Sequence, residues 1–203
     1  MTKERTGDLR DFIKDVYLTS RKRKIPPSKY LDELAEVAQK AKLRKAALDD
    51  FITQISRSNL DELIEHIFEG HLRTTLIRRG SQSGTRVPAA KGIHSELLLD
   101  GVNRKVISGS RRPLNPLDDE IYEAQVQING INKVTPSGNI GKSTFFPRNW
   151  SKERILEEIA FAFKNKRPDT SSPVHFRGVS TNNIEIEFVI LNNEIKTIYP
   201  TLN

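Results

Sequence analysis

Two stretches of alternating apolar and polar residues, each containing an asparagine turn, constrain the fold of this chain most strongly. Residues 184–191 and 194–199 alternate on either side of Asn192-Asn193, and residues 121–128 and 131–134 flank Asn129-Gly130 in the same way. Alternation is typical of strands with one buried face, and these dipeptides favour the tight turns of antiparallel hairpins. We therefore expect antiparallel sheets in the second part of the chain.

The first 57 residues predict helices instead, because their apolar residues recur at helical spacing. A first run ends at the basic tetrad 21–24 and two prolines, Ser28 can cap a second helix, and a third run covers residues 46–55. Three short helices bury little surface alone, so we expect them to pack on the remainder of the chain or to form a homo-oligomer. The tetrad is interpreted as a solvated linker, with RNA contact as the alternative.

The two patterns together predict an α+β protein with an N-terminal helical segment at 1–57 and a second domain at 58–203. Ser58 or Asn59 can cap a helix that begins the second domain, and Ser151 can cap another with an apolar stripe. Residues 70–94 have the glycine, proline and serine content of a long mobile loop. Residues 97–99 and 102–107 predict a further hairpin.

Composition excludes several classes of protein. The chain has 203 residues and no cysteine, which rules out disulfides, thiolate catalysis and cysteine-bound zinc. No apolar run approaches the roughly 20 residues that span a bilayer, and no signal peptide begins the sequence, so we expect a cytoplasmic protein without membrane contact. The net charge is +7, and residues 71–112 contain nine basic residues against only Glu96 and Asp100. This clustering is typical of a protein that binds a polyanionic backbone, although a solvated surface is the commoner explanation of any one charge cluster.

Two histidines are the main candidates for chemistry. His66 lies where Gly70 would end an amphipathic helix, and His94 follows Gly92 ahead of an apolar stretch. A helix C-terminus favours the charged imidazole, so we expect His66 to hold a proton more readily than an isolated histidine. The two side chains could then form an acid/base pair, whereas His71 and His175 are interpreted as surface or structural residues.

Four motifs, in order, resemble the EndoU family of uridylate-preferring endoribonucleases. They are Glu-His-Ile-Phe-Glu-Gly around His66, Gly-Ile-His-Ser-Glu around His94, the block from Gly141 to Ser151, and the terminal Ile-Lys-Thr-Ile-Tyr-Pro. Together they span residues 58–203 and leave the first 57 uncovered. The resemblance implies a domain of antiparallel sheets with flanking helices.

The resemblance also implies the residues of the site. It makes His94 the base that takes the proton of the ribose 2′-hydroxyl, His66 the acid, and Lys142 the cation that stabilises the transition state. Substrate contacts are expected from Ser143, Thr197 and Tyr199. These roles suit cleavage of single-stranded RNA at uridines, which needs a base, an acid and a cation and leaves 2′,3′-cyclic phosphate and 5′-hydroxyl ends. We expect no cofactor and no metal.

Other functions remain open at this stage. A binding module for RNA without catalysis would use the same basic stretch, and a metal-dependent nuclease would need carboxylates near the histidines. A tRNA-cleaving toxin domain of the same family would meet an immunity protein. Because the sequence starts with methionine and a helical segment, we expect a standalone enzyme in preference to such a domain.

Overall fold

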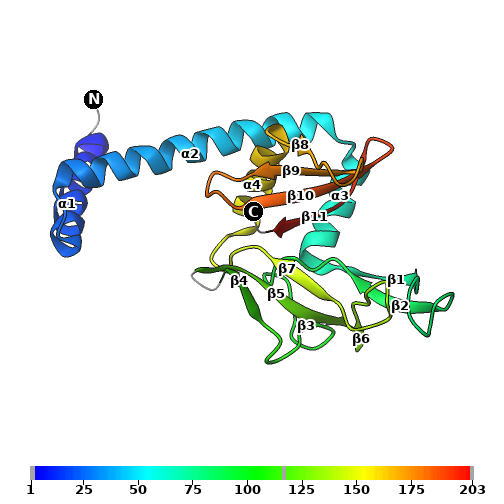
Figure 1. Ribbon diagram of the computed structural model, residues 1–203. Helices are drawn as coiled ribbons and strands as arrows, with labels where there is room; N and C mark the ends of the chain where they lie inside the picture. Colours follow the sequence, from blue (N-terminus) through cyan, green and yellow to red (C-terminus); the bar gives the residue numbers. More distant parts are fainter. Residues whose placement is uncertain (1–2, 116–117, 202–203) are drawn as a thin grey trace. The chain divides into compact units, whose positions relative to one another are not determined.

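The computed structural model describes residues 3–115 and 118–201, and these form an α+β fold, as predicted (Figure 1). The chain divides into two compact units, Met1–Lys45 and Ala46–Asn203, which meet inside a helix. The predicted domain boundary at residue 57 stays a prediction. The last turns of this helix nevertheless pack within the second unit, because Ala47 and Phe51 belong to its core.

The N-terminal unit contains α1 (Lys3–Arg23) and the first part of α2 (Pro27–Gln54). The predicted break between them is confirmed, since α1 ends in the basic tetrad and Lys24 has a positive φ of 56°. The prediction of three helices was wrong. The second and third runs form one helix, because residues 42–45 are helix-forming and contain neither glycine nor proline. Ser28 lies within α2, whose first residue is a proline with φ already suited to a helix.

One layer of the second unit is an antiparallel sheet in the order β11-β10-β9-β8. Its strands are β8 (Arg167–Pro168), β9 (His175–Val179), β10 (Glu185–Leu191) and β11 (Glu194–Thr201). The hairpin through Asn192-Asn193 is confirmed, with both asparagines at positive φ. Helix α4 (Lys152–Lys164), capped by Ser151 as predicted, packs on β9 and β10. The core between these elements contains Phe51, Ile159, Ile186, Phe188 and Ile198.

A second antiparallel layer is built around the long strand β5 (Asp118–Ile128). Its neighbours are β3 (Arg104–Val106), β4 (Arg112–Asn115), β6 (Ile131–Asn132) and β7 (Lys142–Phe145). The hairpin of β5 and β6 turns at Asn129-Gly130, as predicted. A separate core of Tyr122, Val126 and Phe145 stabilises this layer.

The segment at 70–94 is not the long loop that its composition predicted. It forms a hairpin of β1 (His71–Leu76) and β2 (Arg86–Lys91), paired from His71 with Lys91 to Leu76 with Arg86. Only the connection between the two strands contains Gly80 and Gly84, both at positive φ. The glycines therefore mark a turn between strands and give no sign of a disordered lid.

The hairpin predicted across Asp100-Gly101 was also wrong. Residues 97 and 98 form a turn, residues 99–103 are not in a strand, and β3 pairs with β5. The Asp100 carboxylate accepts hydrogen bonds from the backbone of Val102 and Arg104, which satisfies these groups locally and replaces a strand ladder.

Helix α3 (Arg57–Ile64) follows α2 and lies within the second unit. Its N-cap is Ser56, whose hydroxyl accepts from the Asn59 amide, so neither Ser58 nor Asn59 is the cap. The Asn59 side chain instead exchanges two hydrogen bonds with the backbone of Ile195 on β11. This buried amide ties α3 to the terminal hairpin. Within the described residues, no helix is long and apolar enough to cross a membrane.

Close packing of α4 on β9 depends on Gly178. A Cβ atom at this position would lie 1.9 Å from the carbonyl oxygen of Ala162, which belongs to the helix backbone and cannot move without shifting α4. We expect Gly178→Ala to reduce the free energy of unfolding by about 3 kcal/mol, as other overpacked sites do. Urea denaturation followed by circular dichroism measures the change.

Gly101→Ala is the matched control, because nothing lies within 4 Å of its Cβ position although its φ is +72°. Left-handed backbone alone costs about 1–2 kcal/mol. Equal losses in the two variants would contradict the packing argument.

Candidate functional site

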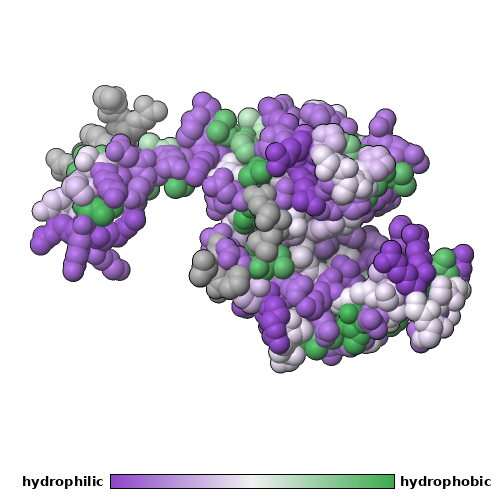
Figure 2. All heavy atoms as spheres, in the orientation of Figure 1, coloured by the Kyte–Doolittle hydropathy of each residue, from purple (hydrophilic) through white to green (hydrophobic). Residues whose placement is uncertain are grey.

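A cleft of about 930 Å³ lies in the second unit, where the two sheets approach each other. Figure 2 shows a hollow between the two layers with hydrophilic residues on both sides. The cleft contains five of the six residues predicted for catalysis or substrate contact, all except Ser143. The full lining consists of Glu62, Leu63, Glu65, His66, His71, Arg73, Lys91, Gly92, His94, Lys133, Lys142, Thr144, Leu191, Ile195, Lys196, Thr197 and Tyr199.

Backbone hydrogen bonds bring the two histidines together although 27 residues separate them in sequence. The amides of Ile93 and His94 donate to the carbonyls of His66 and Ile67 at 2.8 and 2.7 Å. Gly92 permits this approach, because a Cβ atom there would lie 2.1 Å from the His66 carbonyl oxygen. The imidazole centroids are consequently 5.4 Å apart.

His66 lies in a π-helical turn, η1 (Glu65–Glu69), which continues α3. Gly70 ends this turn as predicted, with its amide donating to the Glu65 carbonyl at 2.7 Å. A π turn holds one residue more than an α turn, so it changes the direction in which the following side chains point. Such turns are frequent at functional sites.

His94 is buried, with 2% of its surface exposed. Its Nδ1 lies 2.7 Å from the carbonyl oxygen of Thr144 on β7. Because a carbonyl only accepts, Nδ1 carries the hydrogen and the Nε2 lone pair is left available. Burial lowers the pKa of His94 well below its ordinary value, and the charges of Lys133 and His66 lower it further. The site therefore holds a neutral imidazole of fixed tautomer.

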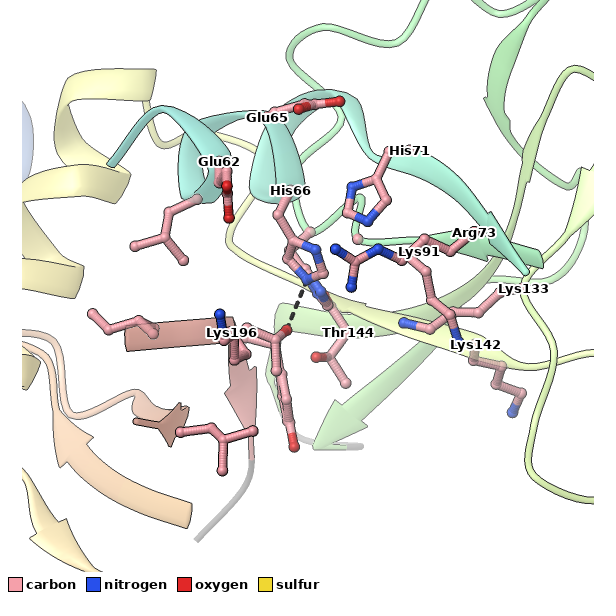
Figure 3. A pocket seen from close by; sticks show the side chains of 17 residues that line it. Glu62, Glu65, His66, His71, Arg73, Lys91, Lys133, Lys142, Thr144 and Lys196 are labelled. Carbon is pink, nitrogen blue, oxygen red and sulfur yellow. Dashed lines mark hydrogen bonds between the residues drawn. The ribbon is translucent and has the colours of Figure 1, made fainter. Parts of the chain in front are cut away.

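The pKa of His66 differs from the sequence-based prediction. Its Nε2 is hydrogen-bonded to the Thr197 hydroxyl at 2.7 Å, the interaction drawn as a dashed line in Figure 3. Burial lowers the pKa of His66 to about 3, assisted by the positive charges of Lys133, His71, Arg73 and Lys91. The expectation that a helix C-terminus would make this histidine hold its proton was wrong, because desolvation and these cations outweigh the helix dipole.

Lys133 is the residue that sequence reasoning missed. Its Nζ donates to the Ser143 hydroxyl at 3.0 Å, and its charge acts on both His66 and His94. Burial and the neighbouring Lys91 lower its pKa to about 8. The signal was present in the sequence, since Lys133 takes an apolar position in the alternation that starts at Ile131.

Lys142 also lines the cleft, on the same side of His66 as Lys133 in the close view (Figure 3). It is an exposed residue of β7, and its amine is paired with Glu123 on β5. Ser143 points to the opposite face of the strand and is buried. It does not line the cleft, because its hydroxyl donates to the Gly92 carbonyl at 2.8 Å and accepts from Lys133.

Thr197 and Tyr199 lie on one face of β11, as their spacing predicted, and both line the cleft. The Tyr199 ring stacks toward His94 with centroids 5.8 Å apart. Its hydroxyl donates to the buried Glu187, and His175 Nδ1 lies 2.6 Å from the same carboxylate oxygen. Burial and the Glu187 charge raise the pKa of Tyr199. The hydroxyl of Tyr199 is thus held by Glu187, while its ring lines the cleft.

Metal-binding groups are not assembled here. Among residues 3–115 and 118–201, no three histidine, aspartate or glutamate side chains come close enough to hold a metal ion. The cations outnumber the acidic residues along the cleft, where Glu62 and Glu65 face Arg73, Lys91, Lys133, Lys142 and Lys196. This charge balance is suited to a polyanion.

Two neutral imidazoles beside a half-buried amine, in an open basic cleft, are the groups of a nuclease. Comparison with known proteins agrees: residues 60–202 match the family described as bacterial EndoU nuclease, and the chain belongs to this family. A toxin of Bacillus cereus is 34% identical over 130 residues, which cover 64% of this chain and 20% of the toxin. The chain thus matches about a fifth of that relative's length. No solved structure matches.

The neutral histidines predict a pH dependence of stability. The pKa of His66 is about 3 in the fold and about 6.5 in an unfolded chain, so the unfolded state takes up a proton first as the pH falls. His94 acts in the same direction. The contribution of these groups is complete above pH 6.5 and is lost as the pH falls from there toward 3. We expect the urea midpoint to fall between pH 7 and 4.5.

The double variant His66→Gln/His94→Gln isolates this effect, because the carboxylates that also titrate at acid pH are common to both proteins. Its urea midpoint should change less between the two pH values than that of the unmodified protein. An equal change in both proteins would show that the histidines are not held neutral.

Proposed function

We propose that this nuclease cleaves single-stranded RNA after uridine by attack of the 2′-hydroxyl, leaving 2′,3′-cyclic phosphate and 5′-hydroxyl ends. The observation that carries the proposal is the pair of imidazoles in one cleft, 5.4 Å between centroids, with Lys133 acting on both. Transesterification of this kind requires one group to accept a proton, another to donate one, and a cation near the phosphate.

His94 is the base in this proposal. Its Nδ1 is occupied by the Thr144 carbonyl, so Nε2 is the atom that accepts the proton of the 2′-hydroxyl. The lowered pKa keeps this nitrogen unprotonated at neutral pH. A base that is already neutral needs no activation before substrate arrives.

His66 is the acid that protonates the departing 5′-oxygen. A pKa of about 3 leaves it neutral in the free protein, and the causes include four neighbouring positive groups. A bound phosphate offsets these charges and raises the pKa of His66, so the imidazole becomes protonated when substrate is present. The Thr197 hydroxyl orients the ring through Nε2.

Lys133 is the preferred cation for the charge that develops on the phosphate. It is partly buried beside the histidines, where a charge acts more strongly than at the surface, whereas Lys142 is exposed and paired with Glu123. We therefore propose Lys133 in the role that the family resemblance assigned to Lys142, and keep Lys142 as the alternative. Ser143 holds the Lys133 amine instead of contacting the base.

Uridine preference is proposed from the wall formed by Thr197 and Tyr199. The Tyr199 ring offers a stacking surface, worth about 1–3 kcal/mol per base but tolerant of any base. Selection of uracil must then come from hydrogen bonds to its polar edge, for which the Thr197 hydroxyl is the nearest candidate on the same face of β11.

Cleavage without a metal is part of the same proposal. The histidines and Lys133 supply the proton transfers and the charge that a Lewis acid would otherwise provide.

The second candidate function is that of a tRNA-cleaving toxin domain of the same family, and the observation in its favour is that a relative is named as a toxin. An immunity protein would then be its partner.

A labelled RNA with a single uridine tests the proposal directly. We expect one cleavage in the presence of EDTA, with a cyclic phosphate on the 5′ fragment and a hydroxyl on the 3′ fragment. The matched RNA with 2′-deoxyuridine should stay intact because it lacks the nucleophile. Equal cleavage at a lone guanosine would refute the base preference, and binding without cleavage would reduce the protein to an RNA-binding module.

Paired lysine variants distinguish the two candidate cations. We expect Lys133→Met to reduce kcat about 10²- to 10³-fold, as loss of other buried transition-state contacts does. Lys142→Met should change kcat by no more than about threefold, since it removes an exposed ion pair. Thermal unfolding of both variants controls for folding. A larger loss in Lys142→Met would return the catalytic role to that residue.

A further inference from the structure

The hairpin of β1 and β2 carries cations that the proposed chemistry does not use. His71 pairs directly with Lys91, and Arg73 follows His71 by two residues on the same face of β1. All three side chains line the cleft. Figure 3 shows them on one side of His66, with Lys196 on the other.

Arg73 and Lys91 have no ion-pair partner among the described residues, whereas Lys142 and Lys196 are each bonded to a glutamate. The nearest acidic groups on this wall, Glu62 and Glu65, act electrostatically on His71. The pKa of Lys91 is lowered mainly by burial and further by the charge of Arg73. The pKa of Lys133 is likewise lowered mainly by burial and further by the charge of Lys91. The fold thus holds three like charges near one another in the absence of a ligand, which is unfavourable until an anion offsets them.

The number of positive charges indicates that Arg73 and Lys91 act on a different phosphate from the one that reacts. A phosphodiester carries one negative charge, which Lys133 can balance beside the histidines. Two further cations on the same wall match a second phosphate. Arginine adds a planar pair of donors that fits phosphate oxygens, and lysine adds a point charge.

We propose that Arg73 and Lys91 form a subsite for the phosphate that neighbours the scissile one in the RNA chain. This inference rests on the proposed function, which it extends from one reacting nucleotide to the segment around it. The subsite makes the nuclease prefer substrates with at least two phosphates. It gives the basic stretch of the sequence a specific task in positioning RNA.

Three short substrates test the proposal: UpA, with only the scissile phosphate, pUpA, with a second phosphate on the 5′ side, and UpAp, with one on the 3′ side. We expect kcat/KM to rise about tenfold for one of the two longer substrates, since each exposed ion pair contributes about a factor of three. The favoured substrate shows on which side of the scissile bond the subsite lies. Equal kcat/KM for all three would overturn the proposal.

The variants Arg73→Gln and Lys91→Gln assign the effect to residues. Each should reduce the ratio of kcat/KM between the favoured longer substrate and UpA to about one third of its original value. The ratio cancels any effect of a lost charge on the histidines or on Lys133. Lys196→Gln, on the other side of His66, is the control and should leave the ratio unchanged. Loss of activity in equal proportion on every substrate would assign Arg73 and Lys91 to the scissile phosphate and overturn the proposal.

Binding measurements separate this inference from the proposed function. Analogues of the three substrates with 2′-deoxyuridine cannot be cleaved by the proposed route, so their affinities report on the subsite alone. The favoured longer analogue should bind about tenfold more tightly than the short one, and Arg73→Gln should remove most of this advantage. If the protein cleaves no RNA, the proposed function fails, whatever the affinities. If it cleaves RNA but the second phosphate adds no affinity, only the subsite fails.

Discussion

The contact between Gly92 and the His66 carbonyl is the constraint on which the rest of the site depends. The Ile93 and His94 amides bond to the π turn, and the His94 carbonyl accepts from Phe146 just beyond β7. The segment around His94 is therefore held on both sides by backbone bonds. Only a residue without a side chain at position 92 allows these elements to approach so closely, since any Cβ would overlap the carbonyl. Two imidazoles from distant parts of the chain are placed by the main chain, and their side-chain bonds to Thr144 and Thr197 then fix the rings.

The electrostatic interactions in the cleft destabilise the folded state of the free protein and favour the binding of an anion. Burial and mutual repulsion keep His66 and His94 neutral and bring the pKa of Lys133 to about 8. Two separate hydrophobic cores, one under each sheet, stabilise the walls that hold these groups together. Hydrogen bonds to Thr144 and Ser143 hold His94 and Lys133 in the cleft, and the other polar groups of the cleft project largely from strands and from a helix end. Little ordering of the protein is then needed when a polyanion enters, so less of the binding energy is lost.

Sequence reasoning predicted the parts of this structure that depend on local patterns. The hairpins at Asn129-Gly130 and Asn192-Asn193 and the capped helix α4 follow from alternation, turn residues and helical spacing. The hairpin of β1 and β2 was missed because glycine and serine in its connection dominated the composition of the whole segment. The order of the histidine motifs led to the family, which the comparison confirmed.

Lys133 and the neutral state of His66 could not be read from neighbouring residues, because both depend on which groups the fold brings together and how deeply it buries them. The same holds for Ser143, whose hydroxyl is directed away from the cleft by the alternation of β7. The block around Lys142 lies within the residues that match the family. The cation whose charge acts most strongly on both histidines nevertheless comes from the loop that precedes β7.

The π turn at residues 65–69 couples the orientation of His66 to the packing of the fold. A π turn differs from regular helix by a single inserted residue, and its end at Gly70 already leads into a separate hairpin. Removing one residue here would restore α-helical winding and rotate the His66 imidazole by about 100° around the helix axis. Two residues of the same turn, Ile67 and Phe68, are buried in the core of the first sheet. The same deletion would move these core side chains and the carbonyls that accept from Ile93 and His94, so the reactive geometry cannot be removed at this turn without disturbing the packing of the fold.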